Sequence, residues 1–395
     1  MFLALGLYVD MSKKEIYKYR NRPKLFRTFD ILMTVLALLL VACAYAGMVD
    51  PKDFFLAPFM VLAFMPLLVL TLILLVIALV GRRFFSVMIL LIALAATLPI
   101  SQKFFPINTS ENNPAMPVEE TSMLKVMTYN VLGFNHHESA TQSQPSKTMK
   151  LILDSDPDVV LMQEGGAGGV EWEELPSLAP YRKRIMAKYP YSYESTEGLN
   201  ILSKFPFTTV PLGNPSQGRS PLGYNRNLTS YLARAYDLQL PNGKQLRLIN
   251  FRLQSFHLSF GKNMSVRVSP DVKPSPIERM RRSFALRGDN ATDLRKEIDN
   301  SPKNVIVCGD MNDVSTSHVY RLIAGDDLLD AWSKVGLGYG NTYNRHGLYY
   351  RIDHVLYRGA LRALRAKRIK GGSSDHYPLM MTFDIDVSNE TADDE

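Results

Sequence analysis

Cysteine is scarce in this sequence. Among 395 residues there are two, Cys43 in an apolar run near the N-terminus and Cys308 in an apolar, strand-like run. Because these two runs are expected to lie far apart, the cysteines do not indicate a disulfide, which excludes a disulfide-stabilised scaffold. Clustered histidines and cysteines of the kind that bind zinc are also missing.

Charge is missing from three long stretches before residue 101. The apolar runs 31–48, 54–80 and 84–100 contain no charged residue, and each is near or above the ~17–20 residues needed to cross a ~30 Å hydrocarbon core. A buried helical core is the alternative, but it would need a large soluble partner. A cleavable signal peptide fits poorly because two more runs follow the first. We therefore predict three transmembrane helices over residues 29–100, which serve as an anchor because they lack the charges of a transport pathway.

Basic residues flank these runs unevenly. Seven lie between Lys13 and Arg27, before the first run, and Arg82 and Arg83 follow the second. The positive-inside rule then predicts that the basic segment 1–28 is cytoplasmic and that everything after the third helix is extracytoplasmic, periplasmic in a Gram-negative cell. The residues before Met11 look unlike a natural start, so Met1 and Met11 both stay open as the start of translation.

The remainder of the chain divides into three parts. Residues 101–122, rich in Asn, Pro, Ser and Glu, are predicted to form a linker. A domain follows over residues 123–387, and residues 388–395 form an acidic tail. Residues 123–395 contain 34 basic and 30 acidic side chains. This small net positive charge suits a phosphate-bearing substrate but does not by itself indicate nucleic acid.

Short apolar runs in the domain alternate with helix-like segments, which predicts a mixed α/β fold. The predicted strands are residues 124–131, 159–163, 200–203, 230–238, 245–252, 304–308, 351–357 and 378–384. The clearest helix is 277–298, with an apolar face that includes Phe284 and Leu294. Its basic residues are predicted to form a solvated face, with phosphate binding as the alternative: Arg281, Arg282, Arg287, Arg295 and Lys296.

Five of the runs end in acids, amides or imidazole. They are MTYN ending at Asn130, DVVLMQE ending at Glu164, VIVCGDMND with Asp310 and Asn312, YRIDHVLY with Asp353, and SSDHYPL with Asp375 and His376. Each alone is as easily a strand end or a turn, but five in order favour a site. Acid and amide oxygens suit a hard cation such as Mg²⁺ or Mn²⁺. Phosphate-ester hydrolysis needs such a cation, a group that activates water and donors for developing charge.

On these motifs, the segment from about Leu124 to Phe383 resembles the endonuclease/exonuclease/phosphatase superfamily. The pattern is similar to that of membrane-anchored members from Bacteroidetes-type bacteria. The resemblance implies a DNase I-like fold, a four-layer sandwich of two mixed β-sheets flanked by helices, here preceded by the three transmembrane helices. It also implies a metal-dependent hydrolase acting on phosphate ester bonds.

The resemblance further implies a role for each motif residue. Glu164 is the principal metal ligand, helped by Asn130 and Asp375. Asp310 orients or deprotonates the attacking water, and Asn312 donates to the transition state. Asp353 orients His376, which binds the scissile phosphoryl oxygen, while Tyr129 is a weaker candidate for substrate binding.

One position departs from the family pattern. Many members have a second His in N-x-H-L-x-S, whereas this chain reads Asn250-Phe251-Arg252-Leu253-Gln254-Ser255. Arginine cannot act as a general acid at neutral pH, but it can bind a phosphoryl oxygen. Three readings stay open: catalysis without that imidazole, substitution by His257, or reduced activity toward the usual substrate.

The leading hypothesis is therefore a membrane-anchored phosphodiesterase with nuclease-like chemistry. The alternatives are a phospholipid-headgroup phosphodiesterase of the sphingomyelinase kind and a metal- or phosphate-binding domain of low activity. A dense groove of basic and aromatic residues is not recognisable, which weakens the case for nucleic acid. No obligate protein partner is evident.

Overall fold

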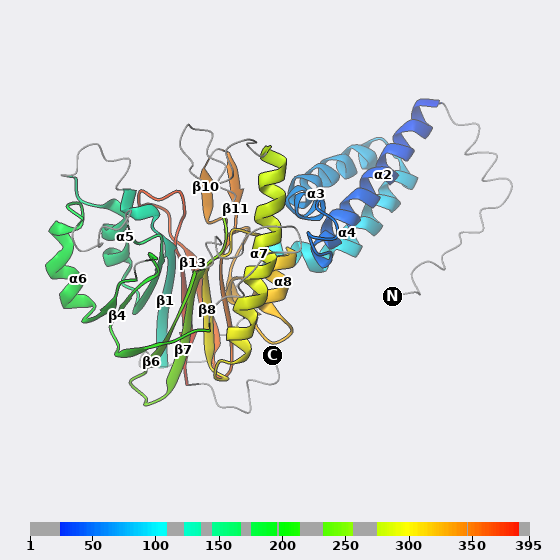
Figure 1. Cartoon of the computed structure of the whole chain (residues 1–395). Helices are drawn as coiled ribbons and strands as arrows, with labels where there is room; N and C mark the ends of the chain where they lie inside the picture. The colour runs from blue at the N-terminus through cyan, green and yellow to red at the C-terminus, as the bar shows by residue number, and fades with distance from the viewer. Residues whose placement is uncertain are drawn as a thin grey trace.

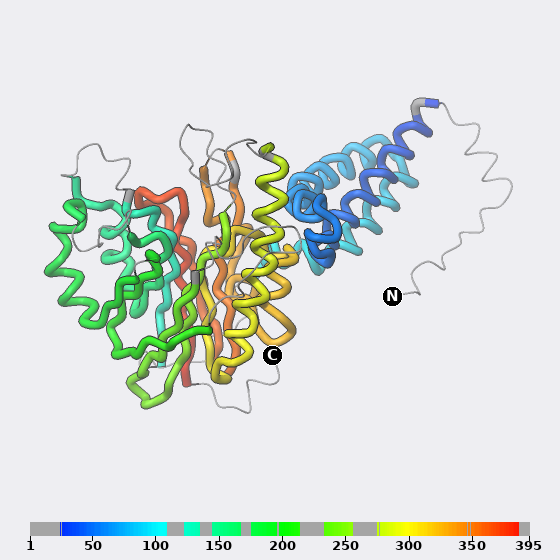
Figure 2. Tube along the Cα trace, in the orientation of Figure 1, coloured from blue at the N-terminus to red at the C-terminus, as the bar shows by residue number. Residues whose placement is uncertain are grey.

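The protein consists of an α/β domain and a bundle of three long helices beside it (Figures 1 and 2). The computed structural model describes residues 24–108, 122–135, 144–166, 175–195, 197–213, 232–255, 275–345 and 347–386. The predicted acidic tail, His257 and most of the basic N-terminal segment lie outside these residues.

The bundle is formed by α2 (Lys24–Tyr45), α3 (Ala57–Val80) and α4 (Phe84–Phe104), with a short helix η1 (Ala46–Met48) after α2. Three helical segments are long and apolar enough to cross a membrane: Phe26–Met48, Ala57–Val80 and Phe84–Phe104. Small or slim side chains such as Ala37 and Ala93 are buried between the helices, whereas Leu38 and Val80 point outward. An apolar outer surface is what a bilayer-facing bundle requires.

The first sheet of the domain has the strand order β13-β14-β1-β2-β4-β3. Its strands are β1 (Met123–Asn130), β2 (Val159–Gln163), β3 (Tyr191–Tyr193), β4 (Asn200–Ser203), β13 (Arg362–Arg368) and β14 (Leu379–Asp384). β1 and β2 are parallel, and β1 and β14 are antiparallel. Every residue of β2 is buried because side chains on both faces of this strand are covered.

The second sheet has the order β5-β6-β7-β8-β12-β9. Its strands are β5 (Phe207–Val210), β6 (Leu232–Gln239), β7 (Gln245–Arg252), β8 (Val305–Asp310), β9 (Leu329–Asp330) and β12 (Asp353–Arg358). β7 and β8 are parallel, and β12 runs antiparallel to β8. A separate hairpin joins β10 (Tyr343–Arg345) and β11 (Leu348–Tyr350).

Helices cover the outer face of each sheet, which makes four layers. Side chains of both sheets, including Leu161 and Ile306, form the core between them. The first sheet is covered by α5 (Lys147–Ser155), η5 (Ala179–Tyr181) and α6 (Arg182–Lys188), and the second by α7 (Pro276–Asp299) and α8 (His318–Ala324). The short helices η3 (Leu132–Asn135) and α9 (Ala331–Val335) follow β1 and β9. The predicted four-layer α/β sandwich is confirmed.

Helix α7 corrects one prediction. Ser275 caps it by accepting a hydrogen bond from the Glu278 amide at 3.2 Å. Among the basic residues of the predicted solvated face, Arg281 and Arg282 are half-exposed and Lys296 is exposed, as expected. Arg295, however, is mostly buried and Arg287 completely so. Arg287 has an exposed fraction of 0% and its Nη1 lies 3.7 Å from Asp313 Oδ2. The expectation failed because α7 lies between the sheet and the bundle, so it is covered on two sides (Figure 1).

The first residues of the predicted linker contact the domain. Helix α4 continues to Phe104, and Ile107 forms a β-bridge with Leu337. The Asn108 side chain donates to the carbonyl oxygens of Ser333 and Gly336, at 3.0 and 2.9 Å. Residues 109–121 lie outside the described part of the chain.

Candidate active site

The polar strand ends predicted from the sequence meet at one end of the sandwich. Asn130 ends β1 opposite Gln163 of β2, and Glu164 follows directly. In the second sheet Arg252 of β7 lies in register with Asp310 of β8, which faces Asp353 of β12. Parallel strands place their carboxyl ends at the same edge of a sheet, where α/β proteins form their sites.

Behind this edge, two buried amides join the sheets. Gln163 donates to the Asn250 side-chain oxygen at 2.7 Å, and Asn250 donates to the Met162 carbonyl at 2.9 Å. Gln163 and Asn250 were not among the predicted site residues. Their signal was present, since each is a single amide inside an apolar strand, where a polar group must find a partner.

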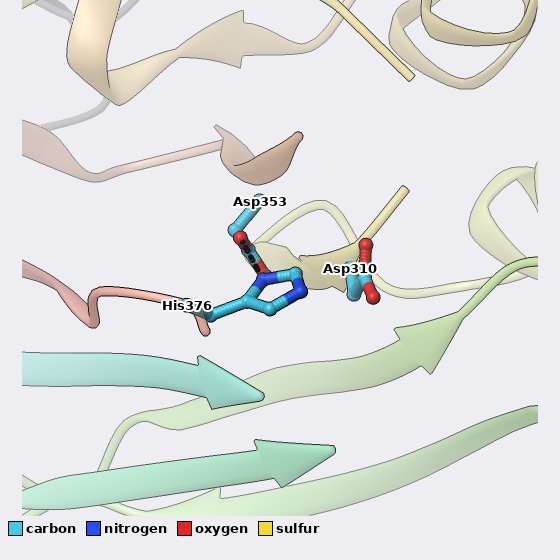
Figure 3. Close-up of side chains that lie close together, drawn as sticks. All are labelled: Asp310, Asp353 and His376. Atoms are coloured by element: carbon cyan, nitrogen blue, oxygen red, sulfur yellow. Dashed lines mark hydrogen bonds and ion pairs between the residues drawn. The ribbon is translucent and has the colours of Figure 1, made fainter. Parts of the chain in front are cut away.

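His376 and Asp353 form a buried pair. The imidazole Nδ1 donates to Asp353 Oδ2 at 2.8 Å, and the other ring nitrogen faces Asp310 (Figure 3). Burial alone would lower the pKa of His376, but the charge and hydrogen bond of Asp353, with Asp310 and Asp375 nearby, raise it to about 10. His376 is therefore an imidazolium at neutral pH.

The Asp310 carboxylate lies in a cradle of amide donors. Oδ1 accepts from the Asn312 backbone amide at 2.9 Å, and Oδ2 accepts from the side chains of Asn130 and Asn312 at 3.0 and 3.1 Å. Burial raises the pKa of Asp310 to about 6, although the His376 charge opposes the shift. This carboxylate thus titrates close to neutral pH, as a general base requires.

Glu164 follows β2 and carries the third acidic side chain of the site. Its Oε1 accepts from Asn130 Nδ2 at 3.0 Å and lies 2.6 Å from Arg252 Nη2. Glu164 and Asn312 both adopt a left-handed backbone, with φ of 54° and 53°. Such conformations cost energy in non-glycine residues and are concentrated at functional sites.

The segment that carries Asp375 and His376 is fixed on two sides. Ser374 Oγ donates to the Asn130 carbonyl at 2.7 Å, and the Asn344 amide donates to the Asp375 carbonyl at 3.0 Å. Arg345 Nη1 lies 3.6 Å from Asp375 Oδ2. The strand end β1 and the β10–β11 hairpin thus position this segment together.

Tyr343, which begins β10, and Thr342 before it support the buried pair of His376 and Asp353. The Tyr343 ring packs edge-on against the imidazole of His376, with 5.4 Å between ring centroids. Thr342 Oγ1 accepts a hydrogen bond at 3.1 Å from each of the backbone amides of Ile352 and Asp353. From the sequence alone, neither residue could be distinguished from a packing or turn residue.

Tyr129 lies in the core beside the site. It has an exposed fraction of 1% and packs with Met149 and Leu153 of α5. Its hydroxyl is so close to Gly372 that a Cβ at that glycine would lie 2.3 Å away. This packing supports a role in positioning the loop before His376, while the predicted contact with substrate stays a prediction.

The donor chemistry fits a hard cation held by Glu164. Ligand atoms of Asp310, Asp353 and His376 also lie within 4.8 Å of one another, but a protonated imidazole that already donates to Asp353 is a poor metal ligand. Glu164 and Asp375 offer carboxylate oxygens, which Mg²⁺ and Mn²⁺ prefer. The Asn130 side chain faces Glu164 with its Nδ2, while its Oδ1 accepts from the Leu132 amide at 3.1 Å. The predicted ligands Glu164, Asn130 and Asp375 could hold such a cation, and the Arg252 guanidinium beside Glu164 would compete with it.

Similarities to known proteins agree with this geometry. Residues 127–376 match the family described as Endonuclease/Exonuclease/phosphatase family, and residues 24–104 match a family described as Domain of unknown function (DUF8431). No curated protein matches the sequence.

Several solved structures are distantly similar, each over 66% of this chain. Endonuclease/exonuclease/phosphatase proteins from Bacteroides thetaiotaomicron and Bacteroides vulgatus are each 14% identical, with 97% and 98% of their chains covered and TM-scores of 0.43 and 0.45. Sphingomyelinase C from Streptomyces griseocarneus is 16% identical, with 99% covered and a TM-score of 0.38. The family match includes every site residue from Asn130 to His376, and the chain belongs to the endonuclease/exonuclease/phosphatase family.

Proposed function

We propose that this protein is a membrane-anchored, divalent-metal-dependent phosphoesterase that hydrolyses a phosphodiester. Members of its family hydrolyse phosphate esters and generally use divalent metals. The observation that carries the proposal is the buried group of His376, Asp353 and Asp310, which combines a cationic donor with a carboxylate that titrates near neutrality.

Each residue of this group has a distinct task in phosphodiester hydrolysis. Asp310 accepts a proton from the attacking water, and its amide cradle holds the carboxylate in one orientation. The imidazolium of His376 donates toward the phosphoryl oxygen on which negative charge develops, and Asp353 keeps it protonated. Asn312 lies beside Asp310 and offers a further amide donor. A divalent cation held by Glu164, Asn130 and Asp375 would neutralise phosphoryl oxygens.

The anchor is supported by the arrangement of charge along the bundle. Arg83, which follows α3, lies 3.5 Å above the ring of Phe26 near the start of α2. This basic end of the bundle is opposite the end that contacts the catalytic domain (Figure 1). By the positive-inside rule, we assign the basic end to the cytoplasm and the domain to the extracytoplasmic side.

The test is a metal-dependent assay on the full-length protein. With Mg²⁺ or Mn²⁺, we expect hydrolysis of bis-p-nitrophenyl phosphate that EDTA abolishes. The variants Asp310→Asn and His376→Ala should lose roughly 10²–10⁴-fold in kcat, whereas Asp326→Asn, at an exposed turn, should not. Equal turnover by the wild type and both site variants would overturn the proposal.

A second candidate is a domain that binds metal or phosphate with little turnover. It is favoured by the position of Arg252, whose guanidinium forms an ion pair with an oxygen of Glu164, the predicted metal ligand. Binding of Mn²⁺ without any metal-dependent hydrolysis would support this candidate over the first.

A further inference from the structure

The helical bundle is packed against the catalytic domain at the ends of its candidate spans. A Cβ on Gly47, after α2, would lie 1.8 Å from the Thr316 carbonyl oxygen. The Lys52 amine lies 2.5 Å from Asp289 of α7, and Arg351 donates to the Lys103 carbonyl near the end of α4 at 3.2 Å. These contacts, from all three helices or their connections, hold the domain in one place relative to the bundle.

The catalytic strand ends lie next to this contact. Val314, two residues after Asn312, has an exposed fraction of 1% and packs among bundle residues that include Leu40 and Phe64. Ile352, which directly precedes Asp353, packs against the same cluster. The site is therefore separated from the bundle by one or two residues, both in the loop after β8 and directly before β12.

The β10–β11 hairpin also contacts the bundle. Tyr350 of β11 donates to the carbonyl oxygen of Leu62, inside α3, at 3.4 Å. Leu62 lies five residues past Ala57, where the candidate span begins, which is about 8 Å along the helix axis at ~1.5 Å per residue. The span Ala57–Val80 has 24 residues, which is about 36 Å and so extends roughly 3 Å beyond a ~30 Å hydrocarbon core at each end. The Tyr350 hydroxyl therefore reaches the inner boundary of the headgroup layer.

Exposed apolar side chains surround the same junction. They come from the connection between α2 and α3, from the segment after α4, and from two loops or strands of the domain: Phe54, Leu56, Phe105, Ile107, Leu337 and Tyr349. Ile107, Leu337 and Tyr349 have exposed fractions of 68%, 64% and 59%. Aromatic and apolar residues at this level are typical of an interfacial belt.

We propose that the β10–β11 hairpin and these six residues form a surface that lies in the headgroup layer of the bilayer spanned by the bundle. The active site then takes a phosphate ester of a lipid in that same leaflet. This inference rests on the proposed function. It adds the location of the substrate, which is the leaflet next to the active site.

The hairpin also provides a path from the headgroup layer to the catalytic residues. Tyr349 is exposed on β11, while Tyr343 of the paired strand β10 packs on His376. Arg345 ends β10, half-exposed and 3.6 Å from Asp375. A lipid phosphate that approaches along the hairpin meets this guanidinium next to the site. The positive charge of the guanidinium favours binding of an anionic group there.

The position of the surface is tested with a fluorescent label. Both native cysteines are buried, Cys43 in the bundle and Cys308 in the core, so a label attaches selectively to Tyr349→Cys in the full chain. In proteoliposomes of phosphatidylcholine and phosphatidylglycerol, we expect a headgroup-attached spin label to quench this fluorophore. The matched control is Tyr191→Cys, exposed on edge strand β3 of the other sheet, which should show no quenching. Equal quenching at both positions overturns the surface.

The substrate is tested by comparing lipids in the same vesicle with lipids in added, protein-free vesicles. The probes are phosphatidylcholine, phosphatidylglycerol and phosphatidic acid, with release of phosphorylated headgroup or phosphate as the measurement. We expect hydrolysis of at least one of them, on the order of 100-fold faster in the same vesicle, because anchoring raises the effective concentration.

Soluble bis-p-nitrophenyl phosphate, measured in the same samples, separates the inference from the proposed function. The inference is overturned if that substrate is hydrolysed but none of the three lipids is cleaved. It is also overturned if the lipids are cleaved at equal rates in both vesicle populations. If bis-p-nitrophenyl phosphate is not hydrolysed at all, the proposed function fails instead, and the labelling result still decides the position of the surface.

Discussion

The His376 imidazole donates to the Asp353 carboxylate at 2.8 Å, and both side chains are almost completely buried. A buried carboxylate beside an imidazole fixes which ring nitrogen carries the proton and stabilises the charged form. The pair comes from two sheets, since Asp353 begins β12 and His376 precedes β14. The charge of the site therefore depends on how the two sheets pack.

The Asp353→Asn variant tests whether the charge of His376 depends on the Asp353 carboxylate. Without the carboxylate, the pKa of His376 falls from about 10 because burial then dominates, and the donor to the phosphoryl oxygen is lost. We expect kcat/KM to fall by roughly 10²–10⁴-fold, and the alkaline limb of the pH profile to move to lower pH. Asp326→Asn serves as the control. An unchanged alkaline limb would contradict this role for Asp353.

Arg252 is predicted to oppose binding of the cation. Its guanidinium lies 2.6 Å from Glu164 Oε1, and both side chains are mostly buried, so the charges are poorly screened. In Arg252→Gln, the Kd for Mn²⁺ measured by calorimetry should fall by about tenfold. If Arg252 also binds substrate phosphate, KM should rise in the same variant.

The control for Arg252 lies on the same strand. Arg247 of β7 is also paired with a carboxylate, that of Asp237 at 2.5 Å, but five residues earlier in the strand. Arg247→Gln should leave the Kd for Mn²⁺ unchanged. Equal changes in both variants would show that charge in general, rather than the Glu164 contact, controls metal binding.

The sequence indicated which residues lie together at the candidate site because their signal is local. Each apolar strand that ends in an acid, amide or imidazole was recognisable by itself, and the structure brings Asn130, Glu164, Asp310, Asp353 and His376 to one edge. Strand β13, with the sequence RALRAKR, has no apolar run, and the β10–β11 hairpin has only three residues in each strand. These elements were missed because sequences this short or this polar do not show the apolar pattern of a strand.

Contacts between distant segments were likewise not predictable. Helical periodicity assumes one covered face, which placed Arg287 in solvent, whereas the bundle covers α7 from the other side. The Phe59 ring of α3 packs edge-on against Phe284 of α7 at 5.3 Å. Nothing in the local sequence indicates such a contact, since it depends on where the two parts of the chain pack together.

His354 is predicted to make stability depend on pH. Burial, assisted by the Arg351 charge, lowers its pKa from 6.5 to about 4. Between these values the unfolded chain binds a proton that the folded protein does not, so the free energy of unfolding falls as the pH falls. The loss reaches about 3 kcal/mol near pH 4 and is absent above pH 6.5.

The variant His354→Gln removes this titration. Thermal unfolding of the solubilised protein, measured between pH 7 and pH 4.5, should show a smaller loss of midpoint temperature in the variant than in the wild type. The lower starting stability of the variant does not affect the comparison, because only the change with pH is used. Parallel losses in both proteins would contradict the prediction.

Arg287 is expected to be the most sensitive basic residue of α7. Its guanidinium is completely buried, 3.7 Å from the buried Asp313 carboxylate and 4.7 Å from the Phe284 ring centroid. Arg287→Ala leaves a buried carboxylate without this charge and should lower the free energy of unfolding by roughly 3–5 kcal/mol. Arg282→Ala, on the same helix, loses a half-exposed pair with Glu278 and should cost less than about 1 kcal/mol.

Denaturant unfolding of both variants in the same detergent measures the difference. The double variant Arg287→Met, Asp313→Asn should recover part of the lost stability, because it removes the buried charge that the single change leaves behind. A double variant no more stable than Arg287→Ala would mean that the cost comes from packing against Phe284 and the bundle, and not from the charge of Asp313.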